Sequence, residues 1–136
     1  VGVGYGKEED SGTAAANKQD DTFTTGYFTY AMGGLTLGYQ MSAGNGGTTA
    51  TNSNEVEIMG VSFAVNDNLS ISVNSMENEF DKPSGTNVTE ETDGVGISYT
   101  MGSASLRMLR AETSNKGGVS TAKDVEHTEV SLLLAF

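Results

Sequence analysis

The feature that most constrains the fold is a strict alternation of apolar with small or polar residues at residues 35–41 and 94–101. Successive side chains of a β-strand point to opposite faces, so a period of two predicts strands with one apolar face and one small polar face. The apolar faces of these two stretches hold Leu35, Leu37, Tyr39 and Met41, then Val95, Ile97, Tyr99 and Met101.

Less regular alternation elsewhere raises the expected number of strands to eight. The further stretches are residues 1–5, 23–32, 56–65, 69–80, 104–112 and 127–136. Short turns of residue types that accept positive φ alternate strictly with long polar connections. The turns are Gly33-Gly34, Asn66-Asp67-Asn68 and Gly102-Ser103, and the connections are 7–22, 42–55, 81–93 and 113–126. This order predicts an antiparallel up-and-down sheet with all its long loops at one end.

Composition excludes several classes of protein. The chain has no cysteine, so it has neither disulfides nor thiolate metal sites, and no apolar run is long enough for a membrane-spanning helix. Its net charge of −11, with only seven scattered Lys and Arg residues, argues against nucleic-acid binding. Nearly all acidic residues lie in the long connections or the strand ends beside them, which predicts an acidic rim.

The small polar faces favour enclosed water over open solvent, because a water-facing sheet is normally covered by Lys and Glu. Backbone groups in hydrocarbon must all be paired, so strands with a single apolar layer facing lipid have to close into a cylinder. We therefore expect one domain over residues 1–136, an all-β antiparallel transmembrane β-barrel in the outer membrane of a Gram-negative bacterium. Aromatic residues expected near the short turns, as an interfacial girdle, are Tyr30, Tyr39, Phe63, Tyr99 and Phe136. A soluble β-sandwich is an alternative, and it would need a doubled apolar layer.

Four segments, FTYAMGGLTLGYQMS, VSFAVNDNLSISV, GVGISYTMGSASL and HTEVSLLLAF, resemble the C-terminal half of the general porins of alphaproteobacteria. The resemblance implies half of a 16-stranded, trimeric, water-filled channel. Residues 1–7 are shorter than the roughly 9 to 11 residues of a membrane-spanning strand, which predicts truncation at the N-terminus. The constriction loop would then belong to the missing half. The final strand ends on Phe136 and resembles the signal that the barrel-assembly machinery reads.

The residues expected to line the pore are Thr36, Gly38, Gln40, Ser98, Thr100, Ser105 and Arg107. Arg110 has the opposite parity, so either it snorkels from the long-loop end of the lipid face or a β-bulge near Leu109 turns it inward, and we favour the bulge. His127, the single histidine, has no catalytic partners in the sequence and is expected on the surface. No catalytic motif occurs, so we expect no enzyme and no cofactor.

Acidic clusters on the long-loop side are expected to form a solvated, cation-attracting rim, with Ca²⁺ binding as the alternative. They comprise Glu8, Glu9, Asp10, Asp20, Asp21, Glu77, Glu79, Asp81, Glu90, Glu91 and Asp93. The expected function is passive diffusion of small hydrophilic solutes and ions with a preference for cations. Expected partners are outer-membrane lipid, lipopolysaccharide and two further copies in a homotrimer. The alternatives are a closed eight-stranded monomeric barrel with a structural or adhesion role, and a surface enzyme.

Overall fold

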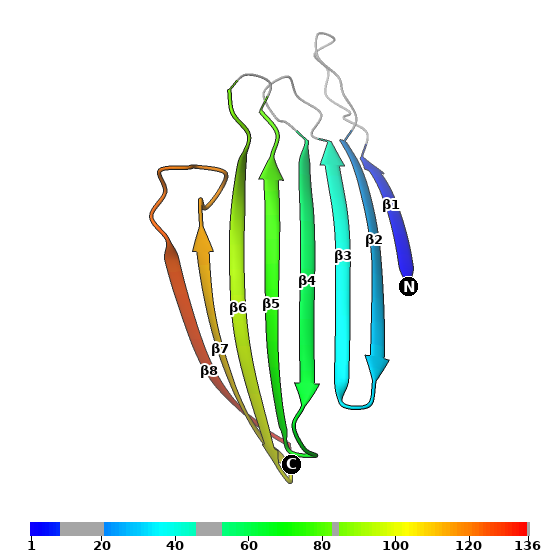
Figure 1. Ribbon diagram of the computed structural model, residues 1–136, viewed down its shortest axis with the longest axis vertical. Helices are drawn as coiled ribbons and strands as arrows, with labels where there is room; N and C mark the ends of the chain where they lie inside the picture. Colours follow the sequence, from blue (N-terminus) through cyan, green and yellow to red (C-terminus); the bar gives the residue numbers. More distant parts are fainter. Residues whose placement is uncertain (9–20, 46–52, 83–84, 136) are drawn as a thin grey trace.

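The chain forms one eight-stranded antiparallel sheet in which every strand pairs with its sequence neighbour (Figure 1). This architecture comes from a computed structural model that describes residues 1–8, 21–45, 53–82 and 85–135. The strands are β1 (Gly2–Glu8), β2 (Asp21–Met32), β3 (Leu35–Asn45), β4 (Asn54–Ala64), β5 (Leu69–Phe80), β6 (Val88–Met101), β7 (Ala104–Ser114) and β8 (Val125–Leu134). The predicted fold class and up-and-down order are confirmed.

The three short connections lie at one end of the sheet, the turn end, as predicted (Figure 1). Gly33 and Gly102 have φ values of 58° and 56°, a region in which glycine avoids the steric penalty of a Cβ. Between β4 and β5, the Asn66 side-chain oxygen accepts hydrogen bonds from the backbone N–H groups of Asn68 and Leu69, both at 2.9 Å. This Asx-type turn reverses the chain without a glycine.

At the opposite end, the loop end, the strands run further than the apolar alternation predicted. β3 continues to Asn45, and β6 already begins at Val88, within the stretch expected to be a loop. Backbone pairing continues there because Glu91 and Asp93 keep the alternation while replacing apolar side chains with acidic ones. The sequence pattern located only the part of each strand that carries alternating apolar side chains, here called the apolar band. The hydrogen-bonded sheet extends beyond this band toward the loop end.

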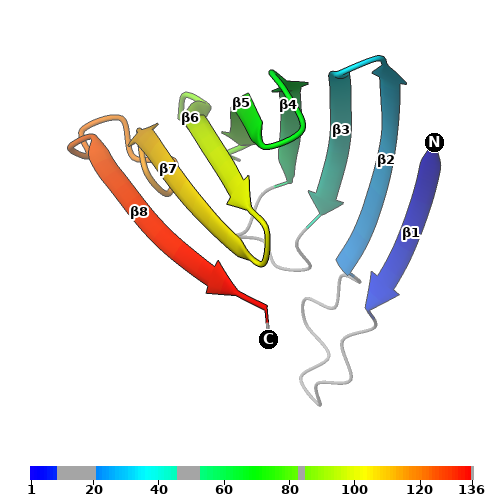
Figure 2. The same ribbon diagram turned by 90° about the horizontal axis from the view of Figure 1, so that it is seen from below.

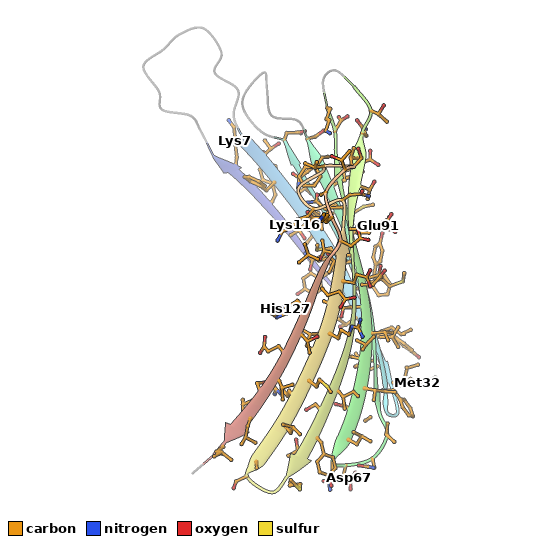
Figure 3. All side chains as sticks on the ribbon, turned by 90° about the vertical axis from the view of Figure 1, so that its left-hand side faces the viewer. Lys7, Met32, Asp67, Glu91, Lys116 and His127 are labelled. Carbon is orange, nitrogen blue, oxygen red and sulfur yellow. The ribbon has the colours of Figure 1, made fainter. Side chains whose placement is uncertain are left out.

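The sheet is curved into a gutter with a concave and a convex face (Figure 2). His127 points to the hollow side, whereas Met32 and Glu91 lie on the other side (Figure 3). The strand register carries these assignments across the sheet: Met32 pairs with Leu35, and Leu35 with Phe63. The alternating apolar residues therefore form the convex face, and the small polar residues form the concave face.

No hydrophobic side chain in the described part of the chain is fully buried, so a dry core is absent from it. Leu37, Ile97 and Leu132 lie on the convex face and are 36%, 46% and 63% exposed. A second sheet that would cover this face, as in a soluble sandwich, is absent from the described residues. The described residues contain no helix with the length and apolarity needed to cross a membrane.

The two edge strands, β1 and β8, do not meet. Within the described residues β1 contacts only β2, and β8 contacts only β7, so the sheet stays open along both edges (Figure 2). The closed eight-stranded barrel, which the sequence left as an alternative, is therefore not formed by these strands.

Candidate functional site

The concave face gathers the residues that the alternation assigned to a pore. Thr36, Gly38, Gln40, Ser98, Thr100, Ser105 and Arg107 all lie on it. Short polar contacts occur on this face both between strands and along one strand. Thr100 Oγ1 on β6 lies 2.7 Å from Ser105 Oγ on β7, and within β3 Gln40 Nε2 donates to Ser42 Oγ at 3.2 Å. Small hydroxyl and amide groups therefore cover this face and offer hydrogen bonds to water.

Sequence reasoning missed two aromatic residues and one acidic residue on the same face. Tyr27 pairs with Gln40, Phe23 pairs with Gly44, and Glu129 pairs with Leu109, all in the concave parity. The adjacent aromatics Tyr27 and Phe28 point to opposite faces, which obscured the alternation in this part of β2. Extending the parity of Thr25 and Thr29 along β2 would have found Tyr27.

Two opposite charges lie in the middle of the concave face, near β8. In the middle of this face, the charged groups among the described side chains are Arg107 on β7 and Glu129 on β8, with the titratable His127 beside them. Glu129 lies opposite Leu109 and so is diagonal to Arg107, and His127 Nε2 lies 3.8 Å from Glu129 Oε2. A single pair of opposite charges therefore interrupts a neutral polar surface.

Arg110 corrects one expectation. The register runs without a bulge through Leu109 and Arg110, which pair with Gly96 and Val95 on β6. Arg110 therefore remains on the convex face, where its Nη2 lies 3.2 Å from Glu126 Oε1, and both side chains are 61% exposed. The expected inward turn was wrong because the register of β7 is regular here and Glu126 offers Arg110 an opposite charge on the convex face itself.

Acidic side chains form a second band on the convex face, toward the loop end. This acidic band consists of Glu55, Glu57, Glu77, Glu79, Glu91, Asp93, Glu112 and Glu126, all of them exposed. Several face each other directly across strands: Glu77 pairs with both Glu57 and Glu91, and Glu112 pairs with both Asp93 and Glu126. The Tyr39 hydroxyl donates to Glu57 Oε1. The Tyr39 hydroxyl is thus bonded to the acidic band on the loop side and not placed in the turn-side girdle expected for it.

The acidic residues expected to attract cations are divided between the faces. Glu77, Glu79, Glu91 and Asp93 point outward, whereas Glu90 lies on the concave side. Glu9, Asp10 and Asp20 lie outside the described residues, as does Phe136, and the side chains of Glu8 and Asp21 are not described. No three or more His, Asp or Glu side chains in the described ranges are grouped to hold a metal ion. Calcium binding stays a prediction.

The connection between β7 and β8, residues 115–124, folds over the loop end on the concave side. Gly117 N–H donates to Glu90 Oε2, Asn115 Nδ2 donates to the Thr89 carbonyl at 3.0 Å, and Lys82 Nζ donates to the Gly118 carbonyl at 3.0 Å. Gly118 is buried against Phe80, a concave-face residue. The segment therefore covers part of the concave face where the sheet meets solvent.

Gly118→Val is expected to detach this segment. Gly118 has a φ of 69°, which costs a residue with a Cβ about 1–2 kcal/mol, and the new Cβ would lie 2.7 Å from Phe80 Cδ2. Limited proteolysis of the folded protein should show faster cleavage at Lys116 and Lys123, with Gly85→Val, also at positive φ but in open space, as the control. Equal cleavage in both variants would contradict the close packing of Gly118.

A curved antiparallel sheet with an apolar outer face, a small polar inner face and no core defines the wall of a membrane β-barrel. The sequence model of the Gram-negative porin family matches residues 1–133 of the chain, which therefore belongs to that family. No curated protein and no solved structure matches it. Membership in this family places the chain in the outer membrane and in the general class of channel proteins. Its origin in an alphaproteobacterium stays a prediction.

Proposed function

We propose that the concave face is the lining of a water-filled channel through which small hydrophilic solutes and ions diffuse passively. The observation that carries this proposal is the division of the sheet by parity. Val73, Val95 and Val130 are 53%, 52% and 65% exposed on the convex face. Ser, Thr, Gly and amide residues make up most of the concave face, which also holds Ile58, Met76, Leu109 and Leu133. Lipid would cover the first surface, and water would wet the second.

The open edges call for further strands. Unpaired N–H and C=O groups along β1 and β8 cannot remain exposed in hydrocarbon, because each would cost several kcal/mol. Eight strands in a closed barrel leave room only for side chains, whereas about 16 strands leave an aqueous channel. We propose that these strands are one half of a 16-stranded barrel and that three such barrels form a homotrimer.

The apolar band and the acidic band of the convex face indicate what surrounds the channel. In this proposal the apolar band contacts lipid and the acidic band lies among the head groups of lipopolysaccharide. The acidic band and acidic loops would raise the local concentration of cations at the mouth, giving the channel a preference for cations. Recognition by the barrel-assembly machinery through the C-terminal strand and Phe136 belongs to the same proposal.

Planar-bilayer recording of the native protein, together with the mass of its detergent-solubilised assembly, tests this function. We expect stable, stepwise ion currents from an assembly with the mass of a trimer, and a reversal potential in a salt gradient that favours cations. An assembly that inserts into the bilayer without conducting would refute diffusion. Currents that favour anions would refute only the cation preference.

A further inference from the structure

The concave face is hollowed between β1 and β4, toward the loop end. This β1–β4 hollow has a volume of about 500 Å³, and its lining includes Phe23, Thr25, Gln40, Ser42, Gly44 and Asn54. None of the described residues that line it carries a formal charge. The hollow thus differs from the opposite side of the gutter, where Arg107 and Glu129 place charge on the concave face.

The rings of two aromatic residues lie close to glycines at this side of the sheet. A Cβ on Gly44 would lie 3.2 Å from Phe23 Cδ1, and a Cβ on Gly2 would collide with the Tyr27 ring, so both rings cover backbone that a side chain would occupy. Phe23 and Tyr27 remain 52% and 48% exposed. They are four residues apart on β2, a separation of about 13 Å along the strand. Both residues are therefore about half exposed on the concave side, Phe23 in the lining of the hollow and Tyr27 outside it.

A polar cluster lies between the two rings. Thr25 Oγ1 and Ser42 Oγ are 2.9 Å apart, and Gln40 Nε2 donates to Ser42 Oγ at 3.2 Å. The Gln40 carbonyl oxygen and its second amide hydrogen have no partner among the described residues. Close to Gly44, Asn54 Nδ2 donates to Asn78 Oδ1 at 3.3 Å. Hydroxyl and amide groups that both donate and accept are therefore available beside the rings.

We propose that the β1–β4 hollow is a binding subsite for a neutral saccharide. An ion would find no opposite charge among the described residues of the lining, and an apolar molecule would desolvate the Thr25–Gln40–Ser42 cluster without replacing its bonds to water. A saccharide satisfies both surfaces, since the C–H groups of its rings pack on aromatic faces and its hydroxyls exchange hydrogen bonds with amides and hydroxyls. The inference deepens the proposed function, on which it rests, by naming a solute class that the channel would retain briefly.

The test uses the native assembly, with maltotriose as the probe and a neutral polyethylene glycol of equal hydrodynamic size as its control. We expect maltotriose to reduce the ion current saturably and to a greater extent than the polymer. Phe23→Ala and Phe23→Leu should each raise the half-blocking concentration roughly tenfold, because both remove the ring face. Phe28→Ala, the same change on the convex face of the same strand, should leave that concentration unchanged.

Isothermal titration of the detergent-solubilised assembly with maltotriose separates this inference from the proposed function. Saturable binding that weakens in Phe23→Ala supports the subsite even if the channel does not conduct. Equal blocking by maltotriose and the polymer in a conducting channel, or a Phe23→Leu variant that binds as the wild type does, would overturn the subsite while diffusion stands. The rings would then serve only to cover the glycines.

Discussion

Ile71→Lys is expected to destabilise the membrane-inserted protein by about 2–4 kcal/mol, the cost of a basic side chain near the bilayer midplane. Ile71 is 45% exposed in the middle of the convex apolar band, between Phe63 and Ile97 on the neighbouring strands. The loss should appear as a lower midpoint of urea unfolding in lipid vesicles and as a smaller fraction of heat-resistant assembly on gels.

Ser72→Lys is the matched control, because Ser72 is the next residue of β5 and points to the concave face. It lies opposite Ser62 and Gly96, which leave room for a longer side chain. We expect this variant to fold with a change in stability below about 1 kcal/mol. If the two variants are equally destabilised, the assignment of the convex face to lipid is wrong.

Arg107→Gln is expected to increase the cation-over-anion permeability ratio. The substitution removes the positive member of the charge pair on the concave face and leaves Glu129, so the middle of this face gains one net negative charge. Two unit charges about 4 Å apart in bulk water interact by about 1 kcal/mol, which corresponds to roughly a fivefold change in the ratio for an ion passing close to the substituted side chain. Reversal potentials measured across a salt gradient report the permeability ratio directly.

Arg110→Gln removes the same charge three residues away on the same strand, but from the convex face. We expect its permeability ratio to stay close to that of the wild type. Glu129→Gln should shift the ratio in the opposite direction to Arg107→Gln. A shift of equal size in the two arginine variants would mean that ions respond to overall charge, and that the concave position of Arg107 has no special effect.

Much of the fold could be predicted because a strand encodes its two faces in consecutive residues. The alternation in residues 35–41 and 94–101 and the turns at Gly33 and Gly102 depend only on local geometry, and all reappear in the structure. The loop-side ends of β3 and β6 could not be located in this way. Their pairing depends on partners on neighbouring strands, and apolar side chains no longer mark it once the strands leave the apolar band.

The sequence predicted which face of the sheet the site residues occupy, but it did not predict which of them are neighbours across strands. Parity assigned Thr36, Gln40 and Ser98 to one face, but only the register between strands brings Phe23 beside Gly44 and Glu129 diagonal to Arg107. Such neighbours are distant in sequence and carry no local signal. The error over Arg110 has the same origin, because its partner Glu126 lies on the neighbouring strand.

The acidic band has a consequence for the medium in which this protein is stable. Glu77 has a carboxylate directly opposite it on both neighbouring strands, and such like-charged pairs destabilise a sheet. Neighbouring strands are about 4.8 Å apart. The screening length is about 10 Å in 0.1 M salt and about 3 Å in 1 M salt, so only concentrated electrolyte shortens it below the strand spacing. Molar salt should therefore stabilise strand pairing at the loop end of this sheet, and transfer to dilute buffer should destabilise it.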